Sequence, residues 1–390
     1  MKKIKIAHVI TRLILGGAQE NTLLTVEGLQ GYDDCSVDLI TGPALGPEGS
    51  LFERAHLNNV SLIEIPEMRR NIHFWRDCVT LIKLFNLFRK KRYDVIHSHS
   101  SKAGIICRVA AFLAGCKIIV HTIHGLPFHP YQSNFLNTLY IFLEKICAVV
   151  TKKIAVVCPE MSRKALAQGI GTPEKFVTVY SGIETEQYKS ISKQSEIGIR
   201  QQYGIPNNAI VVGKIARLFH LKGHKYLLPA AKMIIDKYPD VYFLLVGDGV
   251  LHDILKEKSR ELGIEKNIIF TGLIASQSIP EYINVMDIVV HLSLREGLPR
   301  VVPQSFLLGK PVIAYDVDGA KDIIDNEKNG FLLPPKEVEI LSQKIEYLLK
   351  NPDVAQKMGK EGEQKAWKLF PHEKMVSQLH ALYHELSSCT

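Results

Sequence analysis

Short apolar runs alternate with amphipathic stretches along this chain of 390 residues. Short apolar runs between turn signals are typical of parallel strands that are buried on both faces. The stretches between them carry apolar residues at helical spacing. In the first half the pattern predicts strands at 4–10, 37–40, 62–65, 94–99, 117–120, 153–157 and 176–180, and helices that end near 29, 92, 114 and 150.

The same pattern begins again after residues 185–208. That segment is rich in Ser, Gln, Lys and Pro, which indicates a linker with a short helix. Strands and helices alternate in both halves of the chain. This repetition predicts the α/β class, with two doubly wound Rossmann-like domains. In the second half the predicted strands are 209–216, 242–246, 268–270, 287–292 and 311–315, and the predicted helices are 224–238, 278–286, 299–308, 338–350 and about 353–388.

The composition is that of a globular protein, with 46% hydrophobic and 23% charged residues, and the length suggests two domains or three at most. The seven cysteines form no Cys-x-x-Cys pair and their number is odd, which favours a reducing compartment over a disulfide framework or a zinc site. The first residues enter a strand without the features of a signal peptide, and no uncharged run reaches the roughly 18 residues of a membrane span. We therefore expect a cytoplasmic protein.

The net charge of +8 lies entirely in the first half of the chain. Residues 1–183 hold 22 Lys and Arg against 14 Asp and Glu, and residues 184–390 hold 26 of each. This asymmetry favours an anionic partner for the first half, such as a membrane surface, a phosphorylated acceptor or nucleic acid. A basic excess of this size is equally compatible with a role in solubility alone. No stacking platform or nucleic-acid motif accompanies it, so we expect no nucleic-acid binding.

Residues 69–92 carry much of this positive charge. Arg69, Arg70 and Arg76 lie at or before the start of a strongly amphipathic helix over 74–92, which ends in Arg-Lys-Lys-Arg. One interpretation is an interfacial helix that contacts anionic lipid as a peripheral element on the inner face of the cell membrane. The other is an ordinary domain helix whose basic last turn complements its own dipole.

The stretch that carries the most chemistry is 293–314, which leaves a predicted strand and enters a loop and a short helix. Gly297 permits the turn, and Pro299 suits a first helical position. The predicted helix therefore begins just past the carboxyl end of a strand, where doubly wound sheets bind phosphate. Glu296 at the same place is a candidate acceptor for the hydroxyl groups of a sugar.

These residues resemble glycosyltransferase family 4, whose signature is a glutamate, seven residues and a second glutamate. Glu296-Gly-Leu-Pro fits the first half, and Gln304 stands where the second glutamate is expected. The resemblance extends over nearly the whole chain and is strongest at 209–224, 243–249 and 287–314. It implies a GT-B-type fold, in which two doubly wound Rossmann-like domains face a central cleft.

The resemblance also implies the division of the chain. Ser181-Gly-Ile-Glu184 resembles the family's turn into the second domain. Residues 1–183 then form the acceptor-side domain, 184–365 form the domain that binds the nucleotide sugar, and 366–390 form a helix that crosses back to the first domain.

Four residues match the positions that the family uses for catalysis. Arg217 and Lys222 have the spacing of its two contacts to the donor diphosphate, and two cations on one loop can flank two phosphates. Glu296 matches the acid that holds the donor sugar. His124 matches a histidine that contacts this sugar from the first domain.

A metal site is the alternative interpretation of His124 and its neighbours His121 and His129, which follow the strand at 117–120. Their spacing across a Gly-Pro loop and the lack of a nearby carboxylate argue against zinc. We therefore expect no metal, and we regard His121 and His129 as lesser candidates for the sugar contact.

The remaining donor contacts follow from the resemblance. Gly16-Gly17 lies at a strand-to-helix turn and permits close approach of the backbone to a ligand, although a tight turn explains the pair equally well. Gln304 keeps one carbonyl acceptor for the ribose hydroxyls but lacks the charge of the expected glutamate. The donor-binding residues implied in this way are Gly16, Gly17, Arg217, Lys222, Gly247, Ile274, Glu296, Gly297, Leu298 and Gln304.

The implied activity is the transfer of a sugar from a UDP- or GDP-linked donor, with retention of configuration and without a metal or other cofactor. Fixed positive charge that stabilises the departing diphosphate would be its largest catalytic contribution. We expect a sugar or lipid-linked acceptor in cell-surface polysaccharide or glycolipid synthesis. Two alternatives stay open, which are a non-catalytic nucleotide-sugar-binding or partner subunit and a sugar-nucleotide epimerase or phosphorylase.

Overall fold

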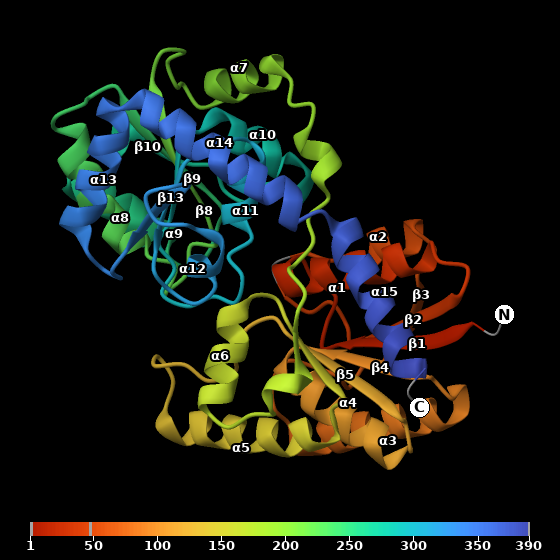
Figure 1. Cartoon of the computed structure of the whole chain (residues 1–390). Coiled ribbons are helices and arrows are strands. Elements are labelled where there is room, and N and C mark those ends of the chain that lie inside the picture. Colours follow the sequence, from red (N-terminus) through yellow and green to blue (C-terminus); the bar gives the residue numbers. More distant parts are fainter. Residues whose placement is uncertain (1–2, 47–48, 389–390) are drawn as a thin grey trace. The chain divides into compact units, whose positions relative to one another are not determined.

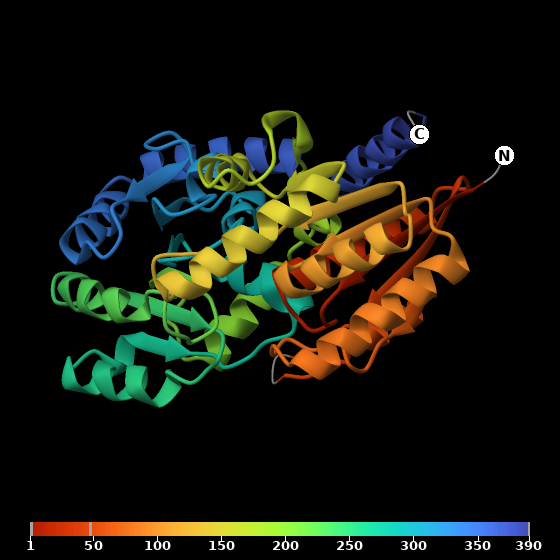
Figure 2. The same ribbon diagram turned by 90° about the horizontal axis from the view of Figure 1, so that it is seen from below.

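The computed structural model describes residues 3–46 and 49–388, and contacts divide the chain into two compact units (Figures 1 and 2). Unit 1 is the chain up to Ile183 together with the chain from His372 onward. Unit 2 is Glu184–Pro371. The chain therefore returns to unit 1 at His372 and not at 366.

Unit 1 is built on seven parallel strands in the order β3-β2-β1-β4-β5-β6-β7. Its helices lie on both faces of this sheet, as expected for a doubly wound domain. The strands are β1 Ile4–Ile10, β2 Cys35–Thr41, β3 Ser61–Glu64, β4 Val95–His99, β5 Ile118–Ile123, β6 Lys153–Val156 and β7 Phe176–Thr178. The helices are α1 Gly17–Gln30, α2 Phe52–Leu57, α3 Phe74–Lys91, α4 Ser101–Leu113, α5 Asn134–Val150, α6 Pro159–Ala167 and α15 His372–Ser388.

The side chains of each strand alternate between two apolar cores. Ile6 and Ile10 of β1 pack with α1 and α15, while Ala7 and Val9 pack with α3 and α4. Figure 1 shows α3, α4 and α5 on one side of the sheet, and Figure 2 looks onto them. The alternation therefore decides which face each polar strand residue joins, including His8 between Ala7 and Val9.

Unit 2 repeats the plan with six parallel strands in the order β10-β9-β8-β11-β12-β13. Both sheets and their doubly wound connections agree with the fold class predicted from the sequence. The strands are β8 Ile210–Ile215, β9 Val241–Val246, β10 Ile268–Phe270, β11 Ile288–His291, β12 Val312–Tyr315 and β13 Gly330–Leu333. The helices are α7 Lys193–Gln202, α8 His224–Ile235, α9 His252–Glu261, α10 Ile279–Val285, α11 Val301–Leu307, α12 Ala320–Ile323, α13 Val338–Lys350 and α14 Pro352–Leu369.

Two helix predictions need correction. The single helix predicted over about 353–388 is two helices, because Pro371 lies between α14 and α15. Proline lacks the N–H that a helix needs, and it disfavours helical conformation in the residue before it. The short helix α11 begins at Val301, so Pro299 lies before its first residue, although the Pro299 carbonyl accepts from the N–H of Val302 over 2.9 Å. Among the described residues, every helix is too short or too polar to cross a bilayer.

Candidate active site

In each sheet the strand order reverses at one point, between β1 and β4 in unit 1 and between β8 and β11 in unit 2. At such a point the connections leave toward opposite faces of the sheet, and ligands bind at the carboxyl ends of the two strands. Gly16 and Gly17 follow β1, Lys222 follows β8 and Glu296 follows β11. The topology of each unit therefore places predicted residues at its switch point.

Lys222 and Glu296 form an ion pair at the switch point of unit 2. Lys222 Nζ lies 2.6 Å from Glu296 Oε1, and His291 Nε2 lies 3.3 Å from the same oxygen. The N–H of Glu296 donates to the carboxylate of Asp318 over 2.6 Å, which orients the loop. Burial alone would raise the pKa of Glu296, but the charge of Lys222 and the contact with His291 outweigh burial and lower that pKa. Glu296 is therefore a fixed carboxylate.

Close backbone packing brings the Lys222 loop to the end of β11. The N–H of Leu294 donates to the carbonyl of Leu221 over 2.8 Å. Gly223 has a φ of 77°, and a Cβ at this position would lie 2.0 Å from the carbonyl oxygen of Leu292. Only glycine allows the Lys222 loop to approach the end of β11 so closely. Gly223 therefore allows Lys222 to reach Glu296.

Buried polar groups without partners lie on the elements next to this ion pair. Among the residues that the structure describes, Lys214 Nζ on β8, both ring nitrogens of His224 and Ser293 Oγ are buried and have no hydrogen-bond partner. Burial and the charge of Lys222 lower the pKa of Lys214 to about 7, although Glu296 raises it. Burial, with the charges of Lys214 and Lys222, lowers the pKa of His224 to about 2. Such groups are rare in native proteins, and their concentration here is typical of a site for a polar ligand.

Arg217 occupies an exposed part of the same loop. Its guanidinium group lies over the ring of Phe219, 4.8 Å from the ring centroid. Gly247 has a φ of 130°, and a Cβ there would lie 2.4 Å from the carbonyl oxygen of Ala216, so the turn after β9 passes directly beside the Arg217 loop. Of the two predicted cations of this loop, Lys222 contacts Glu296 and Arg217 contacts the ring of Phe219. The other predicted residues of unit 2 are buried (Leu298) or half-buried (Gly247, Ile274, Gly297 and Gln304).

The corresponding loops of unit 1 line a cavity of about 230 Å³. Its walls include His124 after β5 and Ser100 before α4. Ser100 has a φ of 63°, and its hydroxyl lies 2.7 Å from Thr11 Oγ1, which ties the loop after β4 to the loop after β1. Gly16 ends that second loop at the start of α1, where a Cβ would lie 2.8 Å from Gln19 Oε1.

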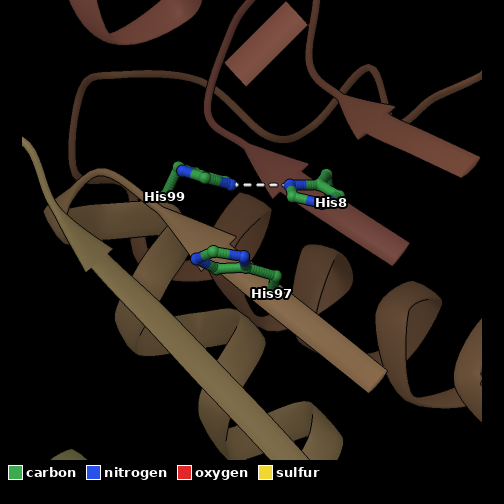
Figure 3. A group of neighbouring side chains, drawn as sticks. All are labelled: His8, His97 and His99. Atoms are coloured by element: carbon green, nitrogen blue, oxygen red, sulfur yellow. Dashed lines mark hydrogen bonds between the residues drawn. The ribbon is translucent and has the colours of Figure 1, made fainter. Parts of the chain in front are cut away.

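His124 continues into a cluster of buried histidines on β1 and β4 (Figure 3). His124 Nε2 lies 3.0 Å from His99 Nδ1, and His99 Nε2 lies 2.9 Å from His8 Nδ1. His8 Nε2 lies 3.2 Å from the hydroxyl oxygen of Tyr383, which comes from α15. The same hydroxyl lies 2.5 Å from His97 Nδ1. A continuous hydrogen-bonded series therefore runs from the cavity wall to the C-terminal helix.

The series has two consistent arrangements of protons. Burial lowers the pKa of His8 to about 3 and that of His99 well below its usual value, so these rings are neutral and each has one donor and one acceptor. If Tyr383 donates to His8, then His8 donates to His99 and His99 donates to His124. If Tyr383 donates to His97, these bonds run in the opposite direction and His124 donates. The tautomer of His124 is therefore coupled to the orientation of one hydroxyl group.

Sequence reasoning missed His8, His97 and His99. The available signal was the His-x-His pattern of β4, which places both side chains on one face, together with register, which pairs His8 with His97. One ring nitrogen of each lies within 4.8 Å of the others, so the three rings could also hold a metal ion. These nitrogens already bond one another, Tyr383 or other neighbours, and the cluster needs no ion to satisfy them.

The histidines of 121–129 bond different partners. His121 Nδ1 lies 2.9 Å from Ser98 Oγ, and its ring packs so close to Gly104 that a Cβ there would lie 2.5 Å from it. The His129 ring accepts from the N–H of Tyr131 over 3.2 Å. These contacts hold both rings in place. His121 and His124 both line the cavity.

Comparison with known proteins covers both units. Residues 15–187 match the family model described as Glycosyltransferase Family 4, and residues 195–365 match the one described as Glycosyl transferases group 1. An Escherichia coli UDP-Gal:alpha-D-GlcNAc-diphosphoundecaprenol alpha-1,3-galactosyltransferase is 29% identical over 340 residues, which are 86% of each chain. The Staphylococcus aureus capsular polysaccharide biosynthesis glycosyltransferase CapM is 25% identical over 322 residues, which are 81% of this chain and 83% of the other.

A solved structure shares the fold. Anabaena HepE in complex with UDP-glucose is 23% identical, with a TM-score of 0.82 over 98% of this chain and 99% of that chain. The agreement extends through both units.

Proposed function

The chain belongs to the family 4 glycosyltransferases and has their GT-B-type fold, and from this premise we propose that it moves a sugar from a nucleotide diphosphate sugar to an acceptor hydroxyl. We propose further that the anomeric configuration is retained and that neither a metal ion nor another cofactor takes part. The Escherichia coli relative uses a UDP-linked donor, which favours UDP over GDP for this chain.

The observation that carries the proposal is the Lys222–Glu296 pair with the buried groups beside it. As the bond from the sugar to the diphosphate breaks, negative charge grows on the diphosphate, and Lys222 and Arg217 supply fixed positive charge for it. Lys214 lies on the strand that leads into their loop and adds a donor whose charge adjusts to the ligand. Glu296 is a carboxylate at neutral pH and accepts hydrogen bonds from sugar hydroxyls.

Retention follows if the acceptor approaches the face from which the diphosphate leaves. The acceptor oxygen then forms the new bond to the sugar, the bond to the diphosphate breaks, and the acceptor proton passes to a diphosphate oxygen. We assign His124 to the donor sugar, where its tautomer decides whether the ring donates to or accepts from a hydroxyl. Gly16 and Gly17 stay predicted donor contacts.

We propose a lipid-linked acceptor, because the Escherichia coli relative is named for one, a diphosphoundecaprenol-linked GlcNAc. Unit 1 offers a surface for such a substrate. Phe74 and Trp75 at the start of α3 are more than two-thirds exposed, and they follow the exposed Arg69 and Arg70. Basic and aromatic groups together are typical of contact with an anionic membrane, so we favour the interfacial interpretation of residues 69–92 over that of an ordinary domain helix.

A second helix extends this surface. Phe135, Phe142 and Val149 of α5 are at least 59% exposed and recur every seven residues, so they share one side of the helix. Figure 1 shows α3 and α5 on the same side of the sheet of unit 1. An apolar stripe along this length is unusual for a surface in water, which favours a bilayer or its lipid-linked substrate as the neighbour.

Release of nucleoside diphosphate tests the proposal directly. The full chain is incubated with a panel of UDP- and GDP-sugars, with and without a polyprenyl-diphosphate-linked N-acetylhexosamine. We expect UDP release that requires the acceptor, loss of release in Glu296→Gln, and unchanged release in the control Lys256→Met, which changes an exposed residue of α9. Turnover of the donor to another sugar nucleotide without acceptor would indicate an epimerase instead.

The second candidate function is a non-catalytic subunit that binds nucleotide sugars. Gln304 favours it, because its neutral amide replaces a charged acceptor for the ribose and weakens each hydrogen bond there. We expect Gln304→Glu to lower the KM for the donor with little change in kcat. Donor binding without turnover in the wild type, together with activity only in Gln304→Glu, would establish the second candidate and reject the first.

A further inference from the structure

The C-terminal helix carries a second cluster of histidines, separate from the buried series. His380 and His384 are four residues apart on α15, so both side chains lie on one face of the helix. Asp34, in the turn between α1 and β2, faces both rings. Its Oδ1 lies 3.0 Å from His380 Nε2, and its Oδ2 lies 2.8 Å from His384 Nε2. The two Nε2 atoms are themselves 3.2 Å apart.

Asp34 Oδ2 also lies 3.2 Å from His380 Nε2, so this oxygen and the two Nε2 atoms form a triangle with the dimensions of one face of a metal coordination polyhedron. Zinc binds imidazole nitrogen and carboxylate oxygen at about 2.0–2.2 Å, so neighbouring ligand atoms lie about 2.8–3.1 Å apart in octahedral geometry and about 3.3–3.6 Å apart in tetrahedral geometry. The three edges of this triangle, 2.8, 3.2 and 3.2 Å, lie close to the octahedral range. One ion placed outside this triangle would be at bonding distance from all three atoms.

The ligand atoms are held in place by neighbours on unit 1. The ring of His380 stacks on Tyr32, with centroids 3.9 Å apart and an interplanar angle of 22°. Such outer contacts orient the ligands of metal sites and strengthen binding. His384 is 44% exposed and Asp34 is 36% exposed, so an ion can reach the cluster from solvent and keep water as a further ligand.

Hydrogen bonds from each ring to Asp34 explain the contacts with this carboxylate, but they do not explain why the two Nε2 atoms lie so close to each other. Two imidazolium groups with their Nε2 atoms 3.2 Å apart repel each other, and two neutral rings have no attraction through nitrogens that both donate to Asp34. A divalent cation removes this conflict, because it accepts the lone pairs of both neutral rings and balances the carboxylate. Imidazole and carboxylate ligands together suit zinc and the neighbouring divalent transition metals.

We propose that Asp34, His380 and His384 bind one divalent transition metal ion, with zinc as its probe, and that the ion clips α15 onto the body of unit 1. Two ligands come from the last helix of the chain, and the third comes from the turn before β2. The clip therefore closes a loop that spans nearly the entire sequence. It also secures the helix that presents Tyr383 to the buried histidine series.

Zinc titration of the full chain tests this inference. The protein is treated with a chelator, dialysed and titrated with ZnCl₂ by calorimetry at pH 7.5, and its thermal unfolding is recorded with and without zinc. We expect one zinc ion per chain and a zinc-dependent rise in the unfolding temperature. His384→Ala removes an exposed ligand without disturbing the core, and it should weaken zinc binding by at least about tenfold and abolish that rise.

A matched control and a second variant make the result specific. His252→Ala removes a histidine of α9 whose Nδ1 lies 3.0 Å from Asp253 Oδ1. His252 belongs to no candidate metal cluster of the described residues, so zinc binding should be unchanged. Asp34→Asn should weaken binding as His384→Ala does, and both variants should lose the visible absorption bands of a Co²⁺ complex. Absence of zinc binding to the wild type would overturn the proposal. Binding that survives in His384→Ala would also overturn it and would direct attention to the buried trio His8, His97 and His99.

Discussion

Replacing Lys214 by methionine should make the folded protein more stable at neutral pH, although it removes a charged residue from the candidate active site. Lys214 is 1% exposed, and its ammonium group has no hydrogen-bond partner among the described residues. Burial and the charge of Lys222 lower its pKa from 10.5 to about 7, and Glu296 only partly opposes them. Methionine has a similar length and carries no charge to desolvate, so it can occupy the same buried space.

The expected magnitude follows from the difference between the two pKa values. The unfolded chain holds the proton of Lys214 up to about pH 10.5, whereas the folded protein releases it near pH 7, so the free energy of unfolding of the wild type rises with pH in this window. At about 1.4 kcal/mol for each pH unit, this lysine costs at most about 4 kcal/mol at pH 7 and about 2 kcal/mol at pH 9. Lys214→Met lacks this cost, so its advantage over the wild type should shrink by about 2 kcal/mol between these pH values.

Urea unfolding at pH 7, 8 and 9 measures the difference in free energy of unfolding between Lys214→Met and the wild type. The chain has two tryptophans, of which Trp75 lies in unit 1 and Trp367 lies on α14 of unit 2. A Trp75→Phe background therefore makes Trp367 fluorescence the reporter of the unit that contains Lys214. Lys256→Met, which changes an exposed residue of α9, is the control. Its free energy of unfolding should differ from that of the Trp75→Phe background by the same amount at all three pH values. If the difference in free energy of unfolding between Lys214→Met and the background is also independent of pH, the lysine is charged in the folded protein and the reasoning from burial is refuted.

Three further predictions concern other parts of the structure. Tyr383→Phe leaves buried ring nitrogens without their hydroxyl partner, so urea unfolding should show a loss of about 2–4 kcal/mol, and the pH profile of kcat should shift if the series controls a catalytic tautomer. Glu144→Gln removes the carboxylate that lies 2.7 Å from the buried Arg108 guanidinium and should cost about 3 kcal/mol by the same measurement, whereas an equal stability would mean that Arg108 finds another partner. Lys222→Met should lower kcat at least about 100-fold in the nucleoside diphosphate assay and should raise the pKa of Glu296, and a change confined to KM would contradict its catalytic role.

The candidate site residues of unit 2 could be chosen from the sequence. Arg217, Lys222 and Glu296 follow apolar runs, and the ends of parallel strands at a switch point meet at one edge of the sheet. The contact of Lys222 with Glu296 could not be predicted from the sequence, because it depends on the packing of β8 beside β11.

Clusters that join distant parts of the chain could not be recognised. His8, His99 and Tyr383 are separated by up to 375 residues, and only strand register and the return of α15 bring them together. The same return places His380 and His384 beside Asp34. No local pattern encodes a contact between a turn near the start of the chain and a helix at its end.

The sequence by itself determined the fold class, the positions of most strands and helices, and the loops to which we assign the chemistry. It could do so because strand and helix periodicity, turn residues and short-range spacing are local properties. Only the tertiary structure decided which polar residues are buried, which lack partners and which histidines meet. Burial and partnership depend on the summed packing of segments far apart in sequence, and they set the charge of Lys214, the tautomer of His124 and the geometry around Asp34.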